Sequence, residues 1–292
     1  MREVLKKKVL VLGSTGLIGH QVFNYLQANG GYELHNISHS NKLNKNTIIL
    51  DARNESLFQK CIVDINPDFI INCIGILISG SNSNPENAIF LNAYLPHSLA
   101  KLANDIDARL IHISTDCVFS GNKHTPYIET DHKDGFGVYS KSKGLGEIIN
   151  ERHLTLRTSV VGPELRNDSE ELFHWFMSQS GTIHGYTKSI WSGVSTTELA
   201  KVVEFSIRNN LTGLYHVSNN SSISKLNLLK LFKKHMAKDI NISSVDGIET
   251  NKSFIDTRKL LNYKIPSYDL MISEMSELVR SNESLYRHYE SK

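Results

Sequence analysis

The chain has 292 residues, 40% of them hydrophobic and 21% charged, which is enough for a well-buried core in one large domain or in a domain with a smaller appendage. Its 32 basic and 30 acidic residues leave a formal charge of +2, which argues against a nucleic-acid-binding protein, because such a protein needs a concentrated basic face. Three scattered cysteines and no stretch of roughly 20 apolar residues argue against a disulfide framework, a zinc site and a membrane span, so we expect a cytoplasmic protein with free thiols at Cys61, Cys73 and Cys117.

Short apolar runs alternate with amphipathic segments through the first half of the chain. The predicted strands are residues 8–13, 33–38, 47–51, 68–75, 109–114 and 154–162. The predicted helices are residues 17–29, 55–65, 85–104 and 137–152. Strands separated by helices predict a doubly wound parallel sheet with helices on both faces, as in a Rossmann-type α/β fold.

After residue 162 the pattern loosens. We expect helices at residues 171–179, 196–208 and 224–238 and one more sheet strand at 213–219, followed by a polar and mixed C-terminal segment. The order predicts a dinucleotide-binding domain formed by residues 1–162 and about 192–220. It also predicts a smaller substrate-binding lobe formed by residues 163–191 and 221–292.

The stretch "GSTGLIG" follows the first predicted strand and opens the first predicted helix. Its glycines, Gly13, Gly16 and Gly19, recur at three-residue spacing. Such a turn brings backbone N–H groups and the positive end of a helix to a pyrophosphate, and side chains larger than hydrogen would block that approach. We therefore predict a dinucleotide-binding turn here, which also includes Thr15.

The region after the second predicted strand indicates which dinucleotide binds. It reads "NISHSNK" and lacks the acidic residue that NAD-preferring sites use to bind the ribose 2′-hydroxyl. His39, Ser40 and Lys42 can instead meet a 2′-phosphate. We therefore predict NADP(H) as the cofactor, with NAD(H) as the alternative.

The ends of the next two predicted strands supply further candidates for cofactor contact. Asp51, which is followed by Ala52, suits a contact to the adenine amino group. The end of the strand at 68–75 is expected to lie along the cofactor, and it contributes Cys73, Ile74 and Gly75.

Tyr139 and Lys143 are four residues apart on a predicted helix, so both side chains can point to the same side. A nearby ammonium stabilises a phenolate and lowers the tyrosine pKa from its reference of about 10, which gives a usable general acid and base. Thr115 lies at the carboxyl end of the preceding strand, where its hydroxyl can bind a substrate carbonyl. Tyr-x-x-x-Lys alone is common on solvated helices, but its place after the glycine turn and this strand favours a catalytic function.

The segments "GSTGLIG", "STDCVFSG", "YSKSKGLGE" and "LRTSVVGPE" stand in this order between residue 9 and about residue 164. They resemble the extended short-chain dehydrogenase/reductase family and, within it, the dTDP-4-dehydrorhamnose reductase group. The resemblance implies that Tyr139 donates a proton, that Lys143 orients the cofactor ribose and tunes Tyr139, and that Thr115 binds the reacting oxygen. It further implies contacts of the pyrophosphate with Gly16, Leu17 and Ile18, and of the substrate with Thr115 and Asp116.

Two positions depart from the rhamnose enzymes, which usually have an aromatic residue at the position of Cys117 and a tryptophan near Val160. The segments "STDCVFSG", "GPEL" and "GYTKSIWSGVSTTELAK" are more similar to reductases of a UDP-2-acetamido-2,6-dideoxy-hexos-4-ulose. Trp191, in a Ser/Gly-rich loop, is the aromatic candidate for substrate contact, whereas Trp175 and Phe176 are expected to anchor the lobe to the core.

We therefore expect an NADPH-dependent enzyme that reduces the 4-keto group of a nucleotide-linked 6-deoxy sugar for a bacterial surface polysaccharide. The alternatives are a dTDP-4-dehydrorhamnose reductase, a nucleotide-sugar epimerase, and a non-catalytic NADP-binding protein similar to the regulatory subunit of methionine adenosyltransferase. We expect no metal site, because the histidines are scattered, and no nucleic-acid or membrane partner. A homodimer is one candidate assembly.

Overall fold

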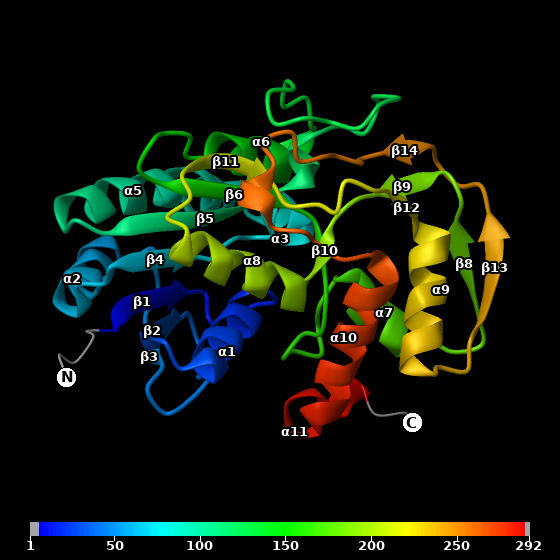
Figure 1. Cartoon of the computed structure of the whole chain (residues 1–292), viewed down its shortest axis with the longest axis horizontal. Helices are drawn as coiled ribbons and strands as arrows, with labels where there is room; N and C mark the ends of the chain where they lie inside the picture. The colour runs from blue at the N-terminus through cyan, green and yellow to red at the C-terminus, as the bar shows by residue number, and fades with distance from the viewer. Residues whose placement is uncertain (1–5, 290–292) are drawn as a thin grey trace.

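The computed structural model describes residues 6–289, with only the backbone at Leu261. Within this range the main sheet has seven parallel strands in the order β3-β2-β1-β4-β5-β6-β11 (Figure 1). Their bounds are Lys7–Leu12 (β1), Tyr32–Ser38 (β2), Ile48–Ile49 (β3), Phe69–Asn72 (β4), Arg109–Thr115 (β5), Leu154–Thr158 (β6) and Gly213–His216 (β11). The predicted Rossmann-type sheet is confirmed.

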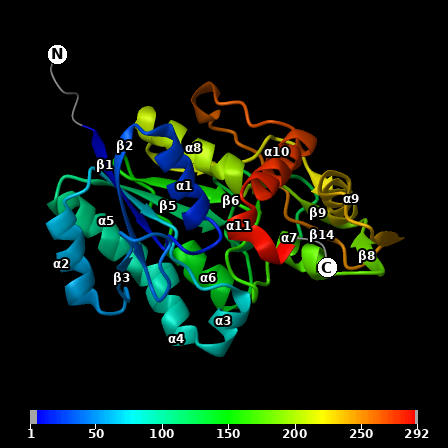
Figure 2. The same ribbon diagram turned by 90° about the horizontal axis from the view of Figure 1, so that it is seen from below.

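Four long helices flank this sheet, namely α1 (Gly19–Asn29), α2 (Glu55–Ile65), α5 (Leu95–Asp105) and α8 (Thr196–Arg208). Successive side chains on a strand point to opposite faces, and both faces of a parallel sheet need an apolar cover. Val9 and Val11 of β1 belong to the core with α1 and α8, whereas Leu10 and Leu12 belong to the core with α2 and α5. Figure 2 shows the resulting layered, doubly wound arrangement.

The strand order reverses at β1, because β2 lies on one side of it and β4 on the other. Ligands of open α/β sheets bind outside the carboxyl ends of the strands at such a reversal. The glycine turn directly follows β1, and Cys73 directly follows β4. The fold therefore brings these two predicted cofactor segments to the switch point of the sheet.

Some helices differ from their predicted bounds. The helix α1 begins at Gly19 rather than at residue 17, because residues 13–18 form the glycine turn. The helix α6 (Gly137–Leu145) ends well before residue 152, and a Cβ on the next residue, Gly146, would lie 2.0 Å from the Asn92 carbonyl oxygen.

The predicted helix at 85–104 and the strand at 154–162 are both divided in the structure. The helix consists of α4 (Pro85–Ala88), a π-helical segment (Ile89–Tyr94) and α5, and an unpredicted helix α3 (Ile78–Ser83) precedes it. The strand is divided into β6 and a short β7 (Val160–Val161), which pairs with β10 (Val194–Ser195).

The C-terminal half forms a smaller set of elements beside the sheet (Figure 1). They are α7 (Leu172–Ser178), β8 (Thr182–Tyr186), β9 (Ser189–Trp191), β12 (Ile223–Ser224), α9 (Lys225–Met236), β13 (Asn241–Val245), β14 (Thr250–Asn251), α10 (Tyr268–Ser281) and α11 (Glu283–Tyr286). The strand β8 pairs with β13, and β9 pairs with both β12 and β14. Helix α10 was not predicted, although its buried residues Met271, Met275 and Val279 recur at four-residue spacing.

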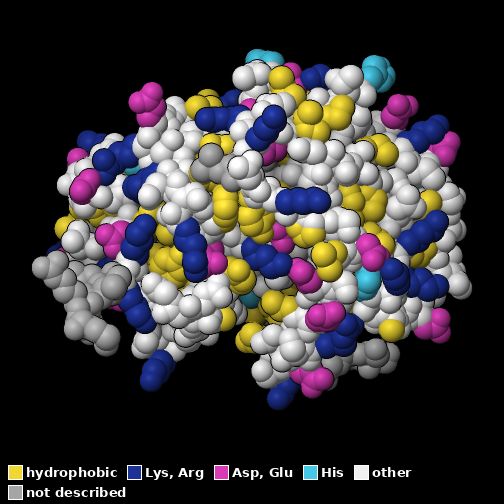
Figure 3. Space-filling model, viewed as in Figure 1, with side chains coloured by type: hydrophobic (Ala, Val, Ile, Leu, Met, Phe, Trp, Pro, Cys, Tyr) yellow, Lys and Arg dark blue, Asp and Glu magenta, His cyan; other side chains and the backbone are white. Residues whose placement is uncertain are grey.

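Charge is mixed on the one face of the molecule that Figure 3 shows. On the face shown in Figure 3, the side chains of Lys and Arg are intermingled with those of Asp and Glu, so this face has no continuous basic area. Within residues 6–289 no helix is both long and apolar enough to cross a bilayer. No group of three or more His, Cys, Asp or Glu side chains in that range is arranged to hold a metal ion.

Candidate active site

The glycine turn after β1 is so tight that two of its glycines have no room for a side chain. Gly13 has a φ of +75°, and a Cβ there would lie 3.1 Å from the carbonyl carbon of Cys73. A Cβ on Gly19 would lie 2.2 Å from the carbonyl oxygen of Gly13. Around Gly16 the nearest atom would be 3.4 Å away, an ordinary contact. The fold thus requires glycine at two positions, and a requirement at Gly16 would come from a ligand.

Side chains from β2 and from α11 hold this turn in place. The Ser14 hydroxyl donates to Asn36 Oδ1 at 2.9 Å. His20 Nδ1 lies 2.8 Å from the Gly16 carbonyl oxygen, and His20 Nε2 lies 3.0 Å from the Tyr286 hydroxyl. Burial lowers the pKa of His20 to about 4, although the contact to Gly16 opposes this, so the ring is neutral at pH 7. At the start of α1 the His20 N–H already donates to the Gly16 carbonyl oxygen at 3.2 Å, so this turn offers an anion the positive end of the helix rather than every first amide group.

Positive charge gathers beyond the carboxyl end of β2. Arg53 makes a two-pronged ion pair with Asp51, at 3.0 Å from Nε to Oδ1 and 2.6 Å from Nη2 to Oδ2. His39 Nε2 lies 3.4 Å from Asp51 Oδ2. The hydrogen bonds from Arg53 lower the pKa of Asp51 to about 2. The predicted residues Ser40 and Lys42 are exposed in the same loop. Arg53 is a further candidate in this area that the sequence did not single out.

The three predicted catalytic residues come from the end of β5 and from α6. The buried ammonium of Lys143 donates to the Ile113 carbonyl oxygen at 2.7 Å, which attaches α6 to β5. Thr115 is the last residue of β5, and its Oγ1 accepts from the N–H of Cys117 at 3.1 Å. A hydrogen bond between the side chains of Thr115 and Tyr139 is one of the influences on the tyrosine pKa. Thr115 and Tyr139 are therefore neighbours, as the sequence predicts.

The pKa values in this group differ from the expectation. Burial raises the pKa of the Tyr139 phenol above its usual value, the neighbouring Cys117 adds to the increase, and the hydrogen bond with Thr115 opposes it. Lys143 does not contribute, so the prediction that its ammonium lowers the tyrosine pKa is wrong for the chain alone. Burial lowers the pKa of Lys143 to about 8, and Glu147 opposes this shift. The arrangement contains a protonated phenol and a readily titrated ammonium.

The chain after β4 lies directly beside Lys143. A Cβ on Gly75 would lie 3.9 Å from Lys143 Nζ. Asn92, in the π-helical segment, fixes this loop because its Oδ1 accepts from the Ile76 N–H at 2.9 Å and its Nδ2 donates to the Ile76 carbonyl oxygen at 3.0 Å. The amide also donates to Ser142 Oγ of α6 at 3.3 Å. Asn92 was not predicted, and its only sequence signal is a polar residue within an apolar helix.

The aromatic residues of the lobe do not lie as the sequence suggested. Trp191 is 3% exposed, its Nε1 donates to Ser159 Oγ at 2.8 Å, and its ring packs against Tyr268. This placement gives Trp191 a packing role rather than a free face for substrate. Phe176 is fully buried as expected, but Trp175 is 37% exposed, so its prediction as a core anchor is wrong. Asp116 lies next to Thr115 and is 4% exposed, so it is about as buried as Trp191.

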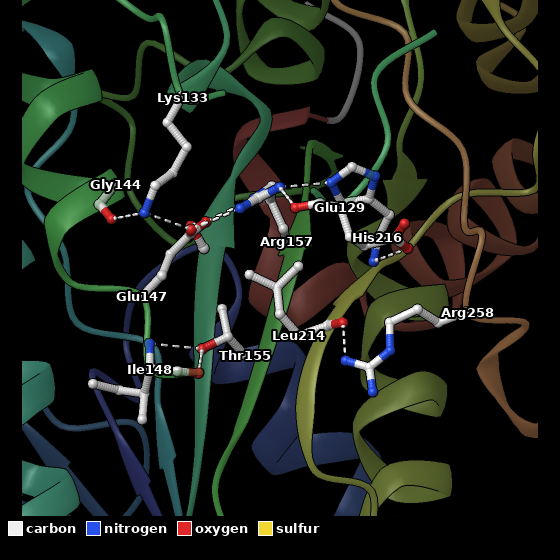
Figure 4. Close-up of polar contacts among 11 residues, drawn as sticks. Glu129, Lys133, Gly144, Glu147, Ile148, Thr155, Arg157, Leu214, His216 and Arg258 are labelled. Carbon is white, nitrogen blue, oxygen red and sulfur yellow. Dashed lines mark hydrogen bonds and ion pairs between the residues drawn. The ribbon is translucent and has the colours of Figure 1, made fainter. Parts of the chain in front are cut away.

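A buried ion pair between Glu147 and Arg157 holds the end of α6 against the sheet (Figure 4). Glu147 accepts from Arg157 Nε and Nη2, both at 2.7 Å, and from Ser114 Oγ at 2.7 Å, and it lies 3.1 Å from Lys133 Nζ. Arg157 continues the network to His216, whose Nε2 lies 2.8 Å from Nη1. This network joins the end of α6 to β5, β6 and β11, and the sequence did not predict it.

Comparisons with known proteins agree with this geometry. Residues 7–259 match the family described as the RmlD substrate binding domain. The dTDP-4-dehydrorhamnose reductase of Escherichia coli (strain K12) is 32% identical over 161 residues, which are 52% of this chain and 51% of that protein, so the chain spans about half the length of this relative. The methionine adenosyltransferase 2 subunit beta of Xenopus laevis is 28% identical over 236 residues, which are 76% of this chain and 70% of that protein.

Among solved structures, the dTDP-4-dehydrorhamnose reductase from Bacillus anthracis str. Ames, in complex with NADP, has a TM-score of 0.80 to this chain at 22% identity. The match covers 93% of this chain and 99% of that one. At this identity the similarity establishes the shared fold.

Proposed function

Because the chain belongs to the RmlD substrate binding domain family, we propose that it is an NADPH-dependent enzyme that reduces the 4-keto group of a nucleotide-linked 6-deoxy sugar. The observation that carries this proposal is the meeting of Thr115, Tyr139 and buried Lys143 at the carboxyl end of β5, beside the glycine turn and the loop after β4. The names of the relatives, which include sugar-nucleotide reductases, support the same reaction class.

The residues at the switch point fit a dinucleotide. The glycine turn and the positive end of α1 suit its pyrophosphate, and at Gly75, near Lys143, a Cβ would lie only 3.2 Å from Asn92 Oδ1, so a larger side chain would crowd this loop. When bound, NADPH supplies a hydride to C4 of the sugar. Thr115 and Tyr139 hydrogen-bond the C4 oxygen as negative charge develops there, and the Tyr139 hydroxyl transfers its proton to that oxygen. The raised pKa of Tyr139 keeps this proton in place before reaction.

A side chain that binds the 2′-phosphate of the ribose would distinguish NADPH from NADH. We predict that Arg53→Ala raises the KM for NADPH about tenfold or more and leaves the KM for NADH nearly unchanged, because a hydrogen bond to a charged group contributes about 1.5–3 kcal/mol. Steady-state kinetics with both cofactors measure this. Arg166→Ala is the matched control, because Arg166 makes the same two-pronged pair with Asp168 two residues away. Equal losses with NADPH and NADH would contradict a 2′-phosphate contact.

The titration of Lys143 predicts a pH dependence. In the proposed function Lys143 orients the cofactor ribose only while its side chain is protonated. Burial lowers the pKa of Lys143 to about 8. We therefore expect kcat/KM to fall as pH rises through about 8, whereas an ordinary lysine would keep its charge well beyond that pH. The pH–rate profile measures this, with Lys141→Met on the exposed side of α6 as control. A profile that is flat through this pH would show that the Lys143 charge is not required.

We further propose a UDP-2-acetamido-2,6-dideoxy-hexos-4-ulose as the substrate, with dTDP-4-dehydrorhamnose as the alternative. Cys117, in place of the aromatic residue usual in rhamnose enzymes, and Val160 support the first. The test mixes the protein with NADPH and a panel of 4-keto sugar nucleotides and follows the loss of NADPH absorbance. In this proposal residues 163–191 and 221–292 form the substrate lobe, and the product is used in a bacterial surface polysaccharide.

A second candidate is a regulatory protein that binds NADP(H) without turnover. The similarity to the methionine adenosyltransferase 2 subunit beta, over 76% of this chain, is the observation that favours it. The buried Lys143 and the neighbouring Thr115 and Tyr139 favour the enzyme, because a binding protein needs no proton donor. Absorbance traces that stay flat across the whole panel, with NADPH bound, would favour the regulatory role.

A further inference from the structure

Two lysines from separate segments approach the substrate side of the candidate site. Lys225 is the first residue of α9, and Lys252 directly follows β14. Lys252 Nζ lies 3.6 Å from Cys117 Sγ, two residues beyond the catalytic Thr115. Lys225 Nζ lies 5.4 Å from the centre of the Trp191 ring. Both ammonium groups influence the pKa of Asp116, so they share one neighbourhood next to Thr115.

These ammonium groups are half-buried but not neutralised by an ion pair. Within residues 6–289 no carboxylate oxygen lies within 4.0 Å of either nitrogen. Lys234, on the exposed side of the same helix as Lys225, is by contrast paired with Asp269 at 2.7 Å. Placing a charge in a partly buried position without a partner costs free energy unless a ligand supplies the opposite charge. The arrangement therefore suits an anion.

One of the buried acids that influence Lys225, namely Glu171, carries little negative charge. Burial raises the pKa of Glu171 to about 8, so this carboxyl is largely protonated at pH 7. Its Oε2 accepts from the N–H groups of Phe173 and His174 at the start of α7, and its Oε1 has no partner in the described part of the chain. Burial also raises the pKa of Asp116, although Lys252 and Lys225 oppose the shift.

We propose that Lys225 and Lys252 bind the diphosphate of the nucleotide-linked substrate. This inference rests on the proposed function and adds residues to its substrate site. The pyrophosphate of the dinucleotide has its own place at the glycine turn after β1, so a second anion site on the C-terminal elements is left for the other phosphorylated ligand. In this proposal the C4 carbonyl of the sugar meets Thr115 and Tyr139, and the diphosphate on C1, across the ring, meets the two lysines.

The test measures binding without turnover. Calorimetric titration with UDP and with dTDP is expected to give a Kd at least about tenfold higher than that of the wild type for Lys225→Met, and likewise for Lys252→Met. The reason is that each hydrogen bond to a charged group contributes about 1.5–3 kcal/mol. Lys234→Met, on the same helix, is the matched control and should bind as wild type. NADPH binding by all variants should be unchanged, which also shows that they are folded.

Each outcome bears on the inference. UDP and dTDP binding by both lysine variants at wild-type strength, or no binding of either nucleotide by the wild type, would overturn it. Inorganic phosphate is a third ligand in the titration. If the lysine variants lose phosphate affinity but keep UDP and dTDP affinity, the site is a free-phosphate site and the inference is also overturned. A wild type that binds UDP through these lysines but oxidises no NADPH would keep the inference and reject the proposed reaction. If the wild type oxidises NADPH with a substrate of the panel and both lysine variants bind UDP and dTDP as the wild type does, the proposed reaction is kept and the inference is rejected.

Discussion

Tyr139→Phe is expected to lower kcat by about 10²–10⁴-fold on an accepted 4-keto sugar nucleotide, because a positioned general acid contributes a factor of this size. The phenol is the group beside Thr115 that carries a proton, and its raised pKa keeps it protonated at neutral pH. The ring itself stays in the variant, so packing around α6 is preserved. Stopped-flow or steady-state measurement of NADPH oxidation gives the ratio of kcat values.

The affinity for NADPH separates a chemical effect from a structural one. The variant should bind NADPH nearly as the wild type does, because Lys143 and the glycine turn are untouched. Tyr186→Phe is the control, since Tyr186 lies on β8 and is 47% exposed. Wild-type turnover by Tyr139→Phe would remove this residue from the mechanism, and a large loss of NADPH affinity would mean that its hydroxyl serves binding instead.

Local spacing was sufficient to predict one part of the site. The glycines at residues 13, 16 and 19 and the four-residue spacing of Tyr139 and Lys143 are properties of consecutive residues, so they are readable before folding. The alternation of strands and helices then predicted the parallel sheet that brings them to one edge. The observed strand order explains why segments far apart in the chain meet there.

The other part depends on contacts that no local pattern encodes. Asn92 acts through a π-helical segment, and hydrophobic periodicity does not distinguish a π-helix from an α-helix. Lys252 reaches Cys117, and Lys225 reaches the Trp191 ring, only after the C-terminal segments pack beside the sheet. The tyrosine pKa was misjudged for a related reason, because spacing reveals that Lys143 is near but not that Tyr139 is buried, and burial raises its pKa.

Arg157→Met is expected to lower the free energy of unfolding by about 3–5 kcal/mol, because it removes the two-pronged partner of a buried carboxylate and leaves Glu147 with only the partly exposed Lys133, 3.1 Å away, as an ionic partner. Arg157 and Glu147 have side chains that are 1% and 0% exposed, so water cannot replace the lost partner. Chemical denaturation at pH 7 measures the loss. The control is Arg166→Met, which breaks the Arg166–Asp168 pair, whose side chains are 61% and 69% exposed, and should cost about 0–1 kcal/mol. Similar losses in the two variants would contradict the importance of burial.

The Arg157–Glu147 pair also predicts how the free energy of unfolding depends on pH. Burial alone would raise the pKa of Glu147, but Arg157, Lys133 and Ser114 together hold it below its usual value of 4.5. A carboxyl with a lowered pKa contributes stability above that value and loses it as pH falls through the lower folded pKa. The difference in unfolding free energy between wild type and Arg157→Met should therefore shrink as pH falls below the usual carboxyl value of 4.5.

Glu147 also links this network to the chemistry, because its charge raises the pKa of Lys143, which lies one helical turn away. Glu147→Gln keeps the shape of the side chain but removes that charge, so the pKa of Lys143 should fall further and the high-pH decrease of kcat/KM should move to lower pH. A purely structural role for Glu147 would lower activity without moving this limb. If a folded Glu147→Gln protein has the same pH profile of kcat/KM as the wild type, the network contributes to stability alone. If the high-pH decrease moves to lower pH, Glu147 is a positioning residue for Lys143.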